Sequence, residues 1–487
     1  MLLTALGLTC TTTTVHASKA KGFSTDVIGI NESHLSSRYW LNKVDVDQKL
    51  LMTSAQISQF NKQLIGDNPH INSPLSMPNF LTDVELLDKV NRISTPSTYP
   101  RYYAGGEQLS TLNYAEYIAS TNQNKVKKNN EVLFALVVNR TGLRRFPTLD
   151  KVYKESTKTS LSASPIITLE QDLDMFQETA LFPGNVVAIL HTSSDEQWYL
   201  AQAYNYLAWL PKKDVAIGNK EVIASYKKEE HFLVITGSQV HTNYLPDYIE
   251  NHEQLSRVKL DMGIRLPLAQ RSEYEHDVHG QNPYSSHIVK LPIKDKKGKL
   301  QFSLAAIARS QDVHVGYLPY NKHNVIQQSF KFLGERYGWG HDYNGRDCTG
   351  FIDEIYKSFG FIMPRNSGQQ AKSTYGVNHF FTKETTSAEK LAVIDEMQSG
   401  DLIYIPGHVM MYLGKDNGQP YIIHDVKDLS YQNKNGDLYY GTLNGVSVTP
   451  LLPLKDYINN ITNIKRMNHN RNVNQRNNTN QGSKISL

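Results

Sequence analysis

The sequence predicts an α+β protein in which a mixed helix-and-strand C-terminal domain follows two small all-β barrels and an irregular, helical N-terminal region. Three observations lead to this prediction. A run with helical apolar spacing, Phe351, Ile355 and Phe359, is followed by strand-like runs at 400–414 and 421–426. Short alternating segments fill the middle of the chain, and part of that stretch is repeated. The region before it has amphipathic runs without a regular order.

Length and composition limit the function classes. A chain of 487 residues is too long for one core and suggests three or four domains. Its 20% charged and 39% hydrophobic residues are ordinary for a globular protein. The formal net charge of +4 is too small to indicate nucleic acid as a partner. At most it favours peripheral contact with an anionic cell-wall or membrane surface.

Residues 1–17 are predicted to be a secretory signal. Leu2 to Leu8 form a short apolar core, and Val15-His16-Ala17 has the small-x-small pattern of a cleavage site. Lipid anchoring through Cys10 and a plain disordered N-terminus are the alternatives. No later run approaches the 18 apolar residues of a membrane-spanning helix. The sequence therefore predicts an exported protein, periplasmic or secreted.

Residues 18–130 are predicted to be an arm of helices and extended chain that packs on the other domains. One helix starts with Thr53 or Ser54 as its N-cap and stops at Gly66. A second amphipathic run extends from Phe80 to Ile93. Neither run contains residues that suggest chemistry.

Residues 131–218 and 219–320 are predicted to form the two barrels. The segment 134–147 is echoed at 232–246, and Leu207–Pro211 is echoed at 315–319. The strands between these markers are short and alternating, as in small barrels. Aromatic residues such as Trp209 have two readings, a surface that binds glycan or peptide and an ordinary barrel core.

Cys348 is predicted to begin a helix that is entered from a loop rich in Gly, Asp and Asn. Unpaired N–H groups at a helix start stabilise a thiolate, so the position predicts a lowered thiol pKa. The alternative is a small buried hydrophobe. Asp347 before the cysteine and Gly350 after it suit a site that another backbone approaches closely, and they favour the nucleophile.

Two histidines downstream complete a candidate catalytic group. His408 opens a strand after the turn Pro406-Gly407, and His424 lies on the next strand-like run. A nucleophilic cysteine needs a general base and a third group that orients the base, and these residues supply both roles in order.

These motifs resemble the NlpC-type papain-like cysteine peptidases of bacterial cell walls. The resemblance covers about residues 321–454 and rests on the following runs: Tyr337-Gly-Trp339-Gly340, Asp347-Cys348-Thr349-Gly350-Phe351, Met363-Pro364-Arg365-Asn366-Ser367 with Gln370, Gly400-Asp401-Leu402, His408-Val-Met-Met-Tyr412-Leu-Gly414 and His424. His341 stands where the family has a second Gly, Thr349 replaces the usual Ser, and Met410-Met411 replace Gly-Ile. The barrels resemble the bacterial Src-homology-3-like domains that accompany such peptidases.

The resemblance implies a papain-like catalytic domain over 321–464, which we expect to open with Asn324 capping a helix and to be followed by a disordered tail at 465–487. It implies hydrolysis of the γ-D-glutamyl bond to a diamino acid in peptidoglycan stem peptides, with Cys348 as nucleophile, His408 as base and His424 as orienting group. Asp347 is the candidate for binding a free N-terminal L-Ala amine. By analogy, Tyr337, Arg365 and Ser367 line the pocket. No metal or other cofactor is implied.

Two alternatives remain at this point. One is a wall-binding protein whose peptidase domain is degenerate and whose barrels carry the function. The other is an acyl or amide transferase on the same scaffold. The sequence does not indicate an oligomeric state.

Overall fold

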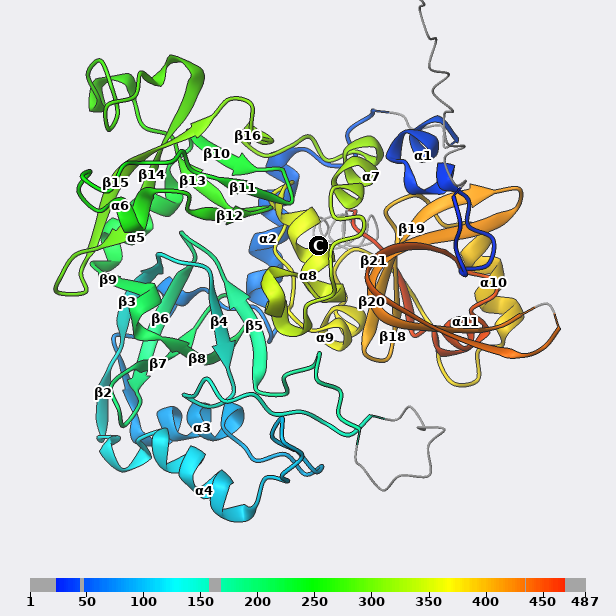
Figure 1. The fold of residues 1–487 in the computed structure, drawn as a ribbon, viewed down its shortest axis with the longest axis horizontal. Helices are drawn as coiled ribbons and strands as arrows, with labels where there is room; N and C mark the ends of the chain where they lie inside the picture. The colour runs from blue at the N-terminus through cyan, green and yellow to red at the C-terminus, as the bar shows by residue number, and fades with distance from the viewer. Residues whose placement is uncertain (1–22, 44–47, 157–167, 434, 469–487) are drawn as a thin grey trace, which may run out of the picture.

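A computed structural model of the protein describes residues 23–43, 48–156, 168–433 and 435–468. Figure 1 shows the C-terminal domain on one side, the two β-rich domains stacked on the other, and α8 (Cys348–Lys357) at the junction of all three. The predicted signal segment, with Cys10, lies outside the described residues. No helix in the described part of the chain has the length and apolarity needed to cross a bilayer.

The C-terminal domain is built on a six-stranded antiparallel sheet with strand order β17-β22-β18-β19-β20-β21. Its strands are β17 (Val377–Phe380), β18 (Leu402–Ile405), β19 (His408–Asp416), β20 (Gln419–Gln432), β21 (Leu438–Pro450) and β22 (Asn463–Arg466). Its helices are α7 (Lys322–Phe330), α8 (Cys348–Lys357), α9 (Ser367–Lys372), α10 (Ser387–Asp395) and α11 (Lys455–Asn460). A helix and a sheet thus share one core, as the α+β prediction requires.

Helix α8 packs its apolar face on that sheet. Phe351, Ile352 and Ile355 are fully buried in one cluster with Val409 and Ile423 of the central strands. The helix begins where the sequence predicts, because the Asp347 side chain accepts the N–H of Gly350 as an N-cap. Burial of this face fixes the position of Cys348 relative to β19.

The first β-domain is a seven-stranded antiparallel sheet with order β5-β4-β8-β7-β6-β3-β9. Its strands are β3 (Leu133–Val137), β4 (Thr141–Arg144), β5 (Gln177–Leu181), β6 (Val186–Thr192), β7 (Trp198–Gln202), β8 (Leu207–Pro211) and β9 (Val215–Gly218). Trp209 and Phe146 have no exposed surface. Of the two readings of these aromatic residues, the structure supports the core.

The second β-domain has its own apolar cluster, enclosed by three small sheets with orders β13-β10-β16, β11-β12 and β14-β15. Its strands are β10 (Phe232–Ile235), β11 (Gln239–His241), β12 (Lys259–Asp261), β13 (Arg265–Pro267), β14 (Ser286–Lys294), β15 (Leu300–Ala308) and β16 (Val313–Val315). Helix α6 (His252–Leu255) lies here, whereas α5 (Lys220–Lys228) packs Ile223 and Tyr226 into the core of the first β-domain. Strands β10 and β11 lie in the segment that echoes β3 and β4.

The N-terminal arm divides between two domains. Helices α1 (Ser37–Lys43) and α2 (Ser54–Asp67) contribute Trp40 and Phe60 to the same core cluster as Cys348. Helices α3 (Asp83–Ile93) and α4 (Thr111–Ser120), with strands β1 (Phe80–Thr82) and β2 (Asn129–Glu131), lie at the first β-domain (Figure 1). The arm therefore completes the cores of domains that follow it in the chain.

Two boundary predictions are wrong. The N-cap of α7 is Asn321, whose side chain accepts the N–H of Asn324 at 2.8 Å. The predicted tail begins too early, because Lys465 is a fully buried residue of β22. Its ammonium donates to the Ser373 carbonyl at 2.7 Å and lies 3.7 Å from the centre of the Tyr375 ring. Those partners offset part of the cost of burying an ammonium that the sequence alone presents as solvated, and burial lowers the pKa of Lys465 to about 7.

Candidate active site

The sulfur of Cys348 lies against the backbone that carries His408. Its Sγ is 4.0 Å from the carbonyl oxygen of Gly407 and accepts a hydrogen bond from the N–H of Val409. These two residues flank His408 at the start of β19. The first turn of α8 and the turn before β19 therefore meet at the candidate nucleophile.

His408 and His424 are hydrogen-bonded across neighbouring strands. Nε2 of His408 lies 2.9 Å from Nδ1 of His424, and the ring centres are 5.2 Å apart. The ring of Tyr457 contacts both imidazoles edge-on, at 5.9 and 6.3 Å between centres. Because Nε2 of His408 is engaged by His424, its Nδ1 is the nitrogen left for the thiol proton.

Thr449 extends this chain by one more bond. Its buried hydroxyl lies 3.0 Å from Nε2 of His424. If His408 keeps Nδ1 unprotonated to accept the thiol proton, its Nε2–H donates to His424, and His424 in turn donates to Thr449 Oγ1. One consistent set of tautomers thus runs from Thr449 to the thiol.

Burial sets the protonation states of the pair. Desolvation, helped by the charge of Asp347, raises the pKa of Cys348 to about 12. Desolvation also lowers the pKa of His408 to about 4. The lowered thiol pKa predicted from the helix start is wrong in direction, since burial and the adjacent carboxylate outweigh the helix N-terminus. The site at rest is a neutral thiol beside a neutral imidazole, and His408 must act as a general base during attack.

Asp347 and Arg365 are bonded to each other. Arg365 Nη2 donates to Asp347 Oδ2 at 2.6 Å, and the N–H of Gly340 donates to the same oxygen at 3.2 Å. Asp347 Oδ1 accepts the Gly350 N–H at 2.8 Å and the Thr349 hydroxyl at 2.9 Å. A carboxylate has about four acceptor positions, and all are taken. The predicted role of Asp347 as the direct receptor for a substrate amine is therefore revised to positioning the nucleophile's helix.

Arg365 also ties the first β-domain to the site. Its Nε donates to the hydroxyl of Thr179 on β5 at 2.5 Å, and its Nη1 donates to Thr349 at 2.5 Å. The residue is 4% exposed, so Arg365 holds domains together instead of lining an open pocket. Ser367 begins α9 and is buried at 9% exposure. Tyr337 is equally buried, and burial together with the nearby Cys348 sulfur raises the pKa of its phenol.

The loop before Cys348 has a strained backbone. His341 (φ 65°), Tyr343 and Asn344 are non-glycine residues with positive φ. The position of His341, where the resembled family has Gly, is one that glycine adopts without cost. Gly350 leaves the space for this side chain, because a Cβ there would lie 2.6 Å from His341 Nε2.

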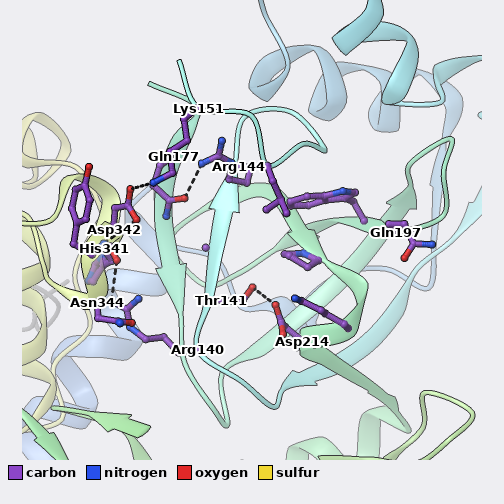
Figure 2. Close-up of a pocket in the computed structure, with 16 residues that line it drawn as sticks. Arg140, Thr141, Arg144, Lys151, Gln177, Gln197, Asp214, His341, Asp342 and Asn344 are labelled. Carbon is purple, nitrogen blue, oxygen red and sulfur yellow. Dashed lines mark hydrogen bonds and ion pairs between the residues drawn. The ribbon is translucent and has the colours of Figure 1, made fainter. Parts of the chain in front are cut away.

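The first β-domain holds this loop in place. Figure 2 shows Arg140, Gln177 and Lys151 reaching from the β-domain to the loop at one side of a cavity of about 580 Å³. Arg140 donates to the carbonyl of His341 at 3.0 Å, and Gln177 donates to that of Gly340 at 2.8 Å. The β-domain is thus a structural part of the site.

Sequence reasoning missed three residues. Thr449 and Tyr457 have no motif of their own, and only the folded sheet and α11 bring them to the histidines. Asp425 is buried with an Oδ1 that has no hydrogen-bond partner. Burial and the charges of Asp347 and Glu335 raise its pKa well above the usual range, so it is a neutral acid near Cys348.

The depressed pKa of His408 predicts an unusual acid limit. His408 can act as a base only when its imidazole is neutral. We therefore expect kcat/KM to stay constant as pH falls from 7 and to decline through about pH 4, well below the pKa of an ordinary histidine. On the basic side, no rise from thiolate formation is expected below about pH 10, because the thiol stays protonated. Initial rates from pH 3.5 to 10 check this, with circular dichroism to verify folding. An acid limit near 6.5 would contradict it.

Thr449→Val is expected to lower kcat about tenfold with little change in KM. The substitution keeps the shape but removes one hydrogen bond, worth about 1–2 kcal/mol when buried. Thr449→Ser keeps the hydroxyl and should restore most of the rate. Equal rates for valine and serine would show that the hydroxyl does not orient His424.

Comparison with known proteins matches two parts of the chain to family models. Residues 334–448 match the model of the NlpC/P60 family, and residues 170–211 match that of an SH3 domain of the SH3b1 type. The C-terminal domain is an NlpC/P60 domain. The first β-domain contains the SH3b-type match, which confirms the sequence resemblance there. That the second β-domain is also a barrel of this kind remains a prediction.

Individual relatives are similar to longer parts of the chain. The chain is 28% identical over 222 residues to a gamma-D-glutamyl-L-lysine dipeptidyl-peptidase of Bacillus cereus, covering 44% of this chain and 55% of that protein. It is 23% identical over 253 residues to dipeptidyl-peptidase 6 of Lysinibacillus sphaericus, covering 50% of this chain and 80% of that protein. The chain is also similar to the solved structure of an NlpC/P60 endopeptidase from Photobacterium damselae subsp. piscicida, with 18% sequence identity and a TM-score of 0.64. That match covers 85% of this chain and 89% of the other chain, and it shows a similar fold.

Proposed function

We propose that the protein is a cysteine peptidase that hydrolyses peptidoglycan stem peptides at the bond between γ-D-glutamate and a diamino acid. The observation that carries this is the connected group in the NlpC/P60 domain: Cys348 at the start of α8, against the backbone of His408, and His408 bonded to His424. The printed name of the Bacillus cereus relative, a gamma-D-glutamyl-L-lysine dipeptidyl-peptidase, supports the choice of bond.

The geometry suggests a mechanism in two halves. The Cys348 sulfur forms a bond to the substrate carbonyl carbon while its proton passes to Nδ1 of His408. The N–H of Cys348, in the first turn of α8 and without an intrahelical acceptor, is placed to stabilise the oxyanion. When the C–N bond breaks, His408 returns the proton to the leaving amine. Water, deprotonated by His408, then attacks the thioester carbonyl. The C–S bond breaks, and His408 returns the proton to the Cys348 sulfur.

The experiment that tests this incubates the full chain with L-Ala-γ-D-Glu-diamino acid and measures the free diamino acid released. Release supports the peptidase. A wall-binding protein with a degenerate domain would release none. A transferase would release diamino acid only when a second amine is supplied, and would form the corresponding new amide.

We further infer that the substrates are released peptides with a free N-terminal L-Ala amine. The support is the position of β5, which is hydrogen-bonded to Arg365 and to the loop at Gly340, the two segments that bind Asp347 beside the nucleophile. We also propose that the protein acts outside the cytoplasmic membrane, as the apolar run and cleavage pattern in residues 1–17 indicate. Comparison of the hydrolysis rates of the tripeptide and of its N-acetylated form tests the first inference.

Asp347→Asn in the same assay separates positioning from recognition. Because Asp347 caps α8 and pairs with buried Arg365, the variant is expected to hydrolyse both peptides at least about tenfold more slowly. Its free energy of unfolding should fall by roughly 3–5 kcal/mol. The preference between the two peptides should stay as in the wild type. A selective loss of the free-amine preference would instead restore Asp347 as the receptor.

A further inference from the structure

A basic groove lies between the two β-domains, on a different set of residues from the catalytic group. It has a volume of about 470 Å³ and is formed by the ends of β7 to β9 and by the turn that joins β14 to β15. We call it the lysine groove. Its charged lining residues are Lys212, Lys213, Lys294, Lys296, Lys297, Lys299, Glu196 and Asp295.

The two sides of the groove are fixed relative to each other. The N–H of Ile217 on β9 donates to the carbonyl of Gly298 in the opposite turn at 3.0 Å. The ammonium of Lys294 reaches back to the carbonyls of Lys212, at 3.4 Å, and of Lys213. The groove is therefore built by contacts between domains, and its lysines face one another because of the fold.

Its positive charge is not neutralised. None of the six lysines forms an ion pair with a carboxylate in the described part of the chain. The Oδ1 of Asp295 is engaged by the N–H groups of Lys297 and Lys299, each at 2.8 Å. Six lysines and two carboxylates leave an excess of four positive charges, as many as the formal net charge of the whole chain.

The cavity of Figure 2 lies next to the lysine groove and differs from it in how its charged side chains are paired. Lys213 and Gln197 line both spaces, but there Arg144 pairs with Asp174 and Lys151 pairs with Asp342. Arg144 and Lys151 therefore already have counter-charges, unlike the lysines of the groove. In the lysine groove, burial and the charges of Lys212 and Lys213 lower the pKa of Lys294, against the opposing effect of Asp214. A bound anion would relieve this repulsion.

We propose that the lysine groove binds a linear anionic polymer of the cell wall, charged through phosphodiester or carboxylate groups. Six ammonium groups along one groove match a chain with repeated charges better than a single ion. A single-stranded nucleic acid would need exposed rings for its bases, whereas Tyr199 is 7% exposed and covered by Lys212 at 5.5 Å. A membrane surface is flat, and this site is concave between two domains. The site goes beyond the proposed peptidase activity and would hold the enzyme on its wall.

The binding test uses the full chain with Cys348→Ala, which keeps the wall intact, and fluorescently labelled linear polyphosphate as the probe. The variant Lys213→Glu/Lys296→Glu/Lys299→Glu reverses three exposed charges of the groove. Anisotropy is expected to show at least about a hundredfold weaker binding. The slope of log affinity against log salt should fall by about three. The control reverses the exposed Lys62, Lys127 and Lys383, with the same change in net charge. Equal losses in both triple variants would overturn the site.

Sedimentation with wall sacculi then identifies the polymer. Loss of binding after acid removal of phosphodiesters assigns a polyol phosphate, and loss only after amidation of carboxylates assigns an acidic glycan or peptide. Binding that survives both treatments overturns the proposal, as does binding to anionic vesicles in preference to sacculi. With Cys348 intact, the groove variant should hydrolyse the soluble tripeptide at the wild-type kcat/KM, so failure of the groove and failure of the peptidase are distinguishable.

Discussion

Replacing Cys348 with alanine is expected to abolish hydrolysis of the γ-D-glutamyl tripeptide while the protein stays folded. The sulfur is the atom that forms the covalent intermediate, so the loss should exceed about four orders of magnitude in kcat/KM. The side chain is small, and its removal from the core should cost only about 1 kcal/mol. Release of diamino acid, with thermal unfolding measured in parallel, checks both statements.

Cys348→Ser is the matched variant, because it keeps the size and a hydrogen-bonding group. The serine hydroxyl has a higher pKa than the thiol, and burial would raise it further, so this variant should also be inactive. Turnover of the alanine variant within tenfold of wild type would remove the cysteine mechanism. The NlpC/P60 domain would then need another nucleophile.

His408→Ala is expected to cost about 10³–10⁴ in kcat, and His424→Ala about ten- to a hundredfold. His408 transfers the proton itself, which is worth at most about 10⁴ in general base catalysis. His424 acts through one hydrogen bond to a ring that becomes charged, worth about 1.5–3 kcal/mol. Single-turnover rates on the tripeptide, which separate chemistry from product release, measure the difference.

His379→Ala provides the control, because this histidine is exposed on β17 of the same sheet. It should be neutral. Added imidazole should restore part of the rate to His408→Ala, since the missing group is a base. Equal or reversed losses for His408 and His424 would mean that their two roles are exchanged.

The parts of the site that sequence could predict are local. Each of them depends on residues only a few positions apart: Asp347 as a cap, the apolar spacing to Phe359, and the turn at Gly407. The sequence therefore indicates the helix, the strands and the order of the catalytic group. The histidines follow because they open or occupy strands that are neighbours in the chain. Structure and sequence agree on the start of α8 at Cys348.

The parts that sequence could not predict depend on distant segments. The pKa of Cys348 is set by burial under β19, which its neighbours in the chain do not show. The engagement of Asp347 by Arg365 requires two loops to meet, and Thr449 reaches His424 only because β20 and β21 pair. Lys465 looks solvated in the sequence because its partners, Ser373 and Tyr375, lie about ninety positions earlier.

The N-terminal arm gives the protein an order of assembly. Trp40 and Phe60 belong to the core that surrounds Cys348, and His34 bonds to Asp416, 382 positions later. Figure 1 shows the first described segment beside the strands near the end of the chain. At ordinary rates of synthesis, the early segment waits on the order of 20–75 s for its partners. During that interval the nascent chain has no closed core around the thiol, so the peptidase is inactive until nearly all of it has been made.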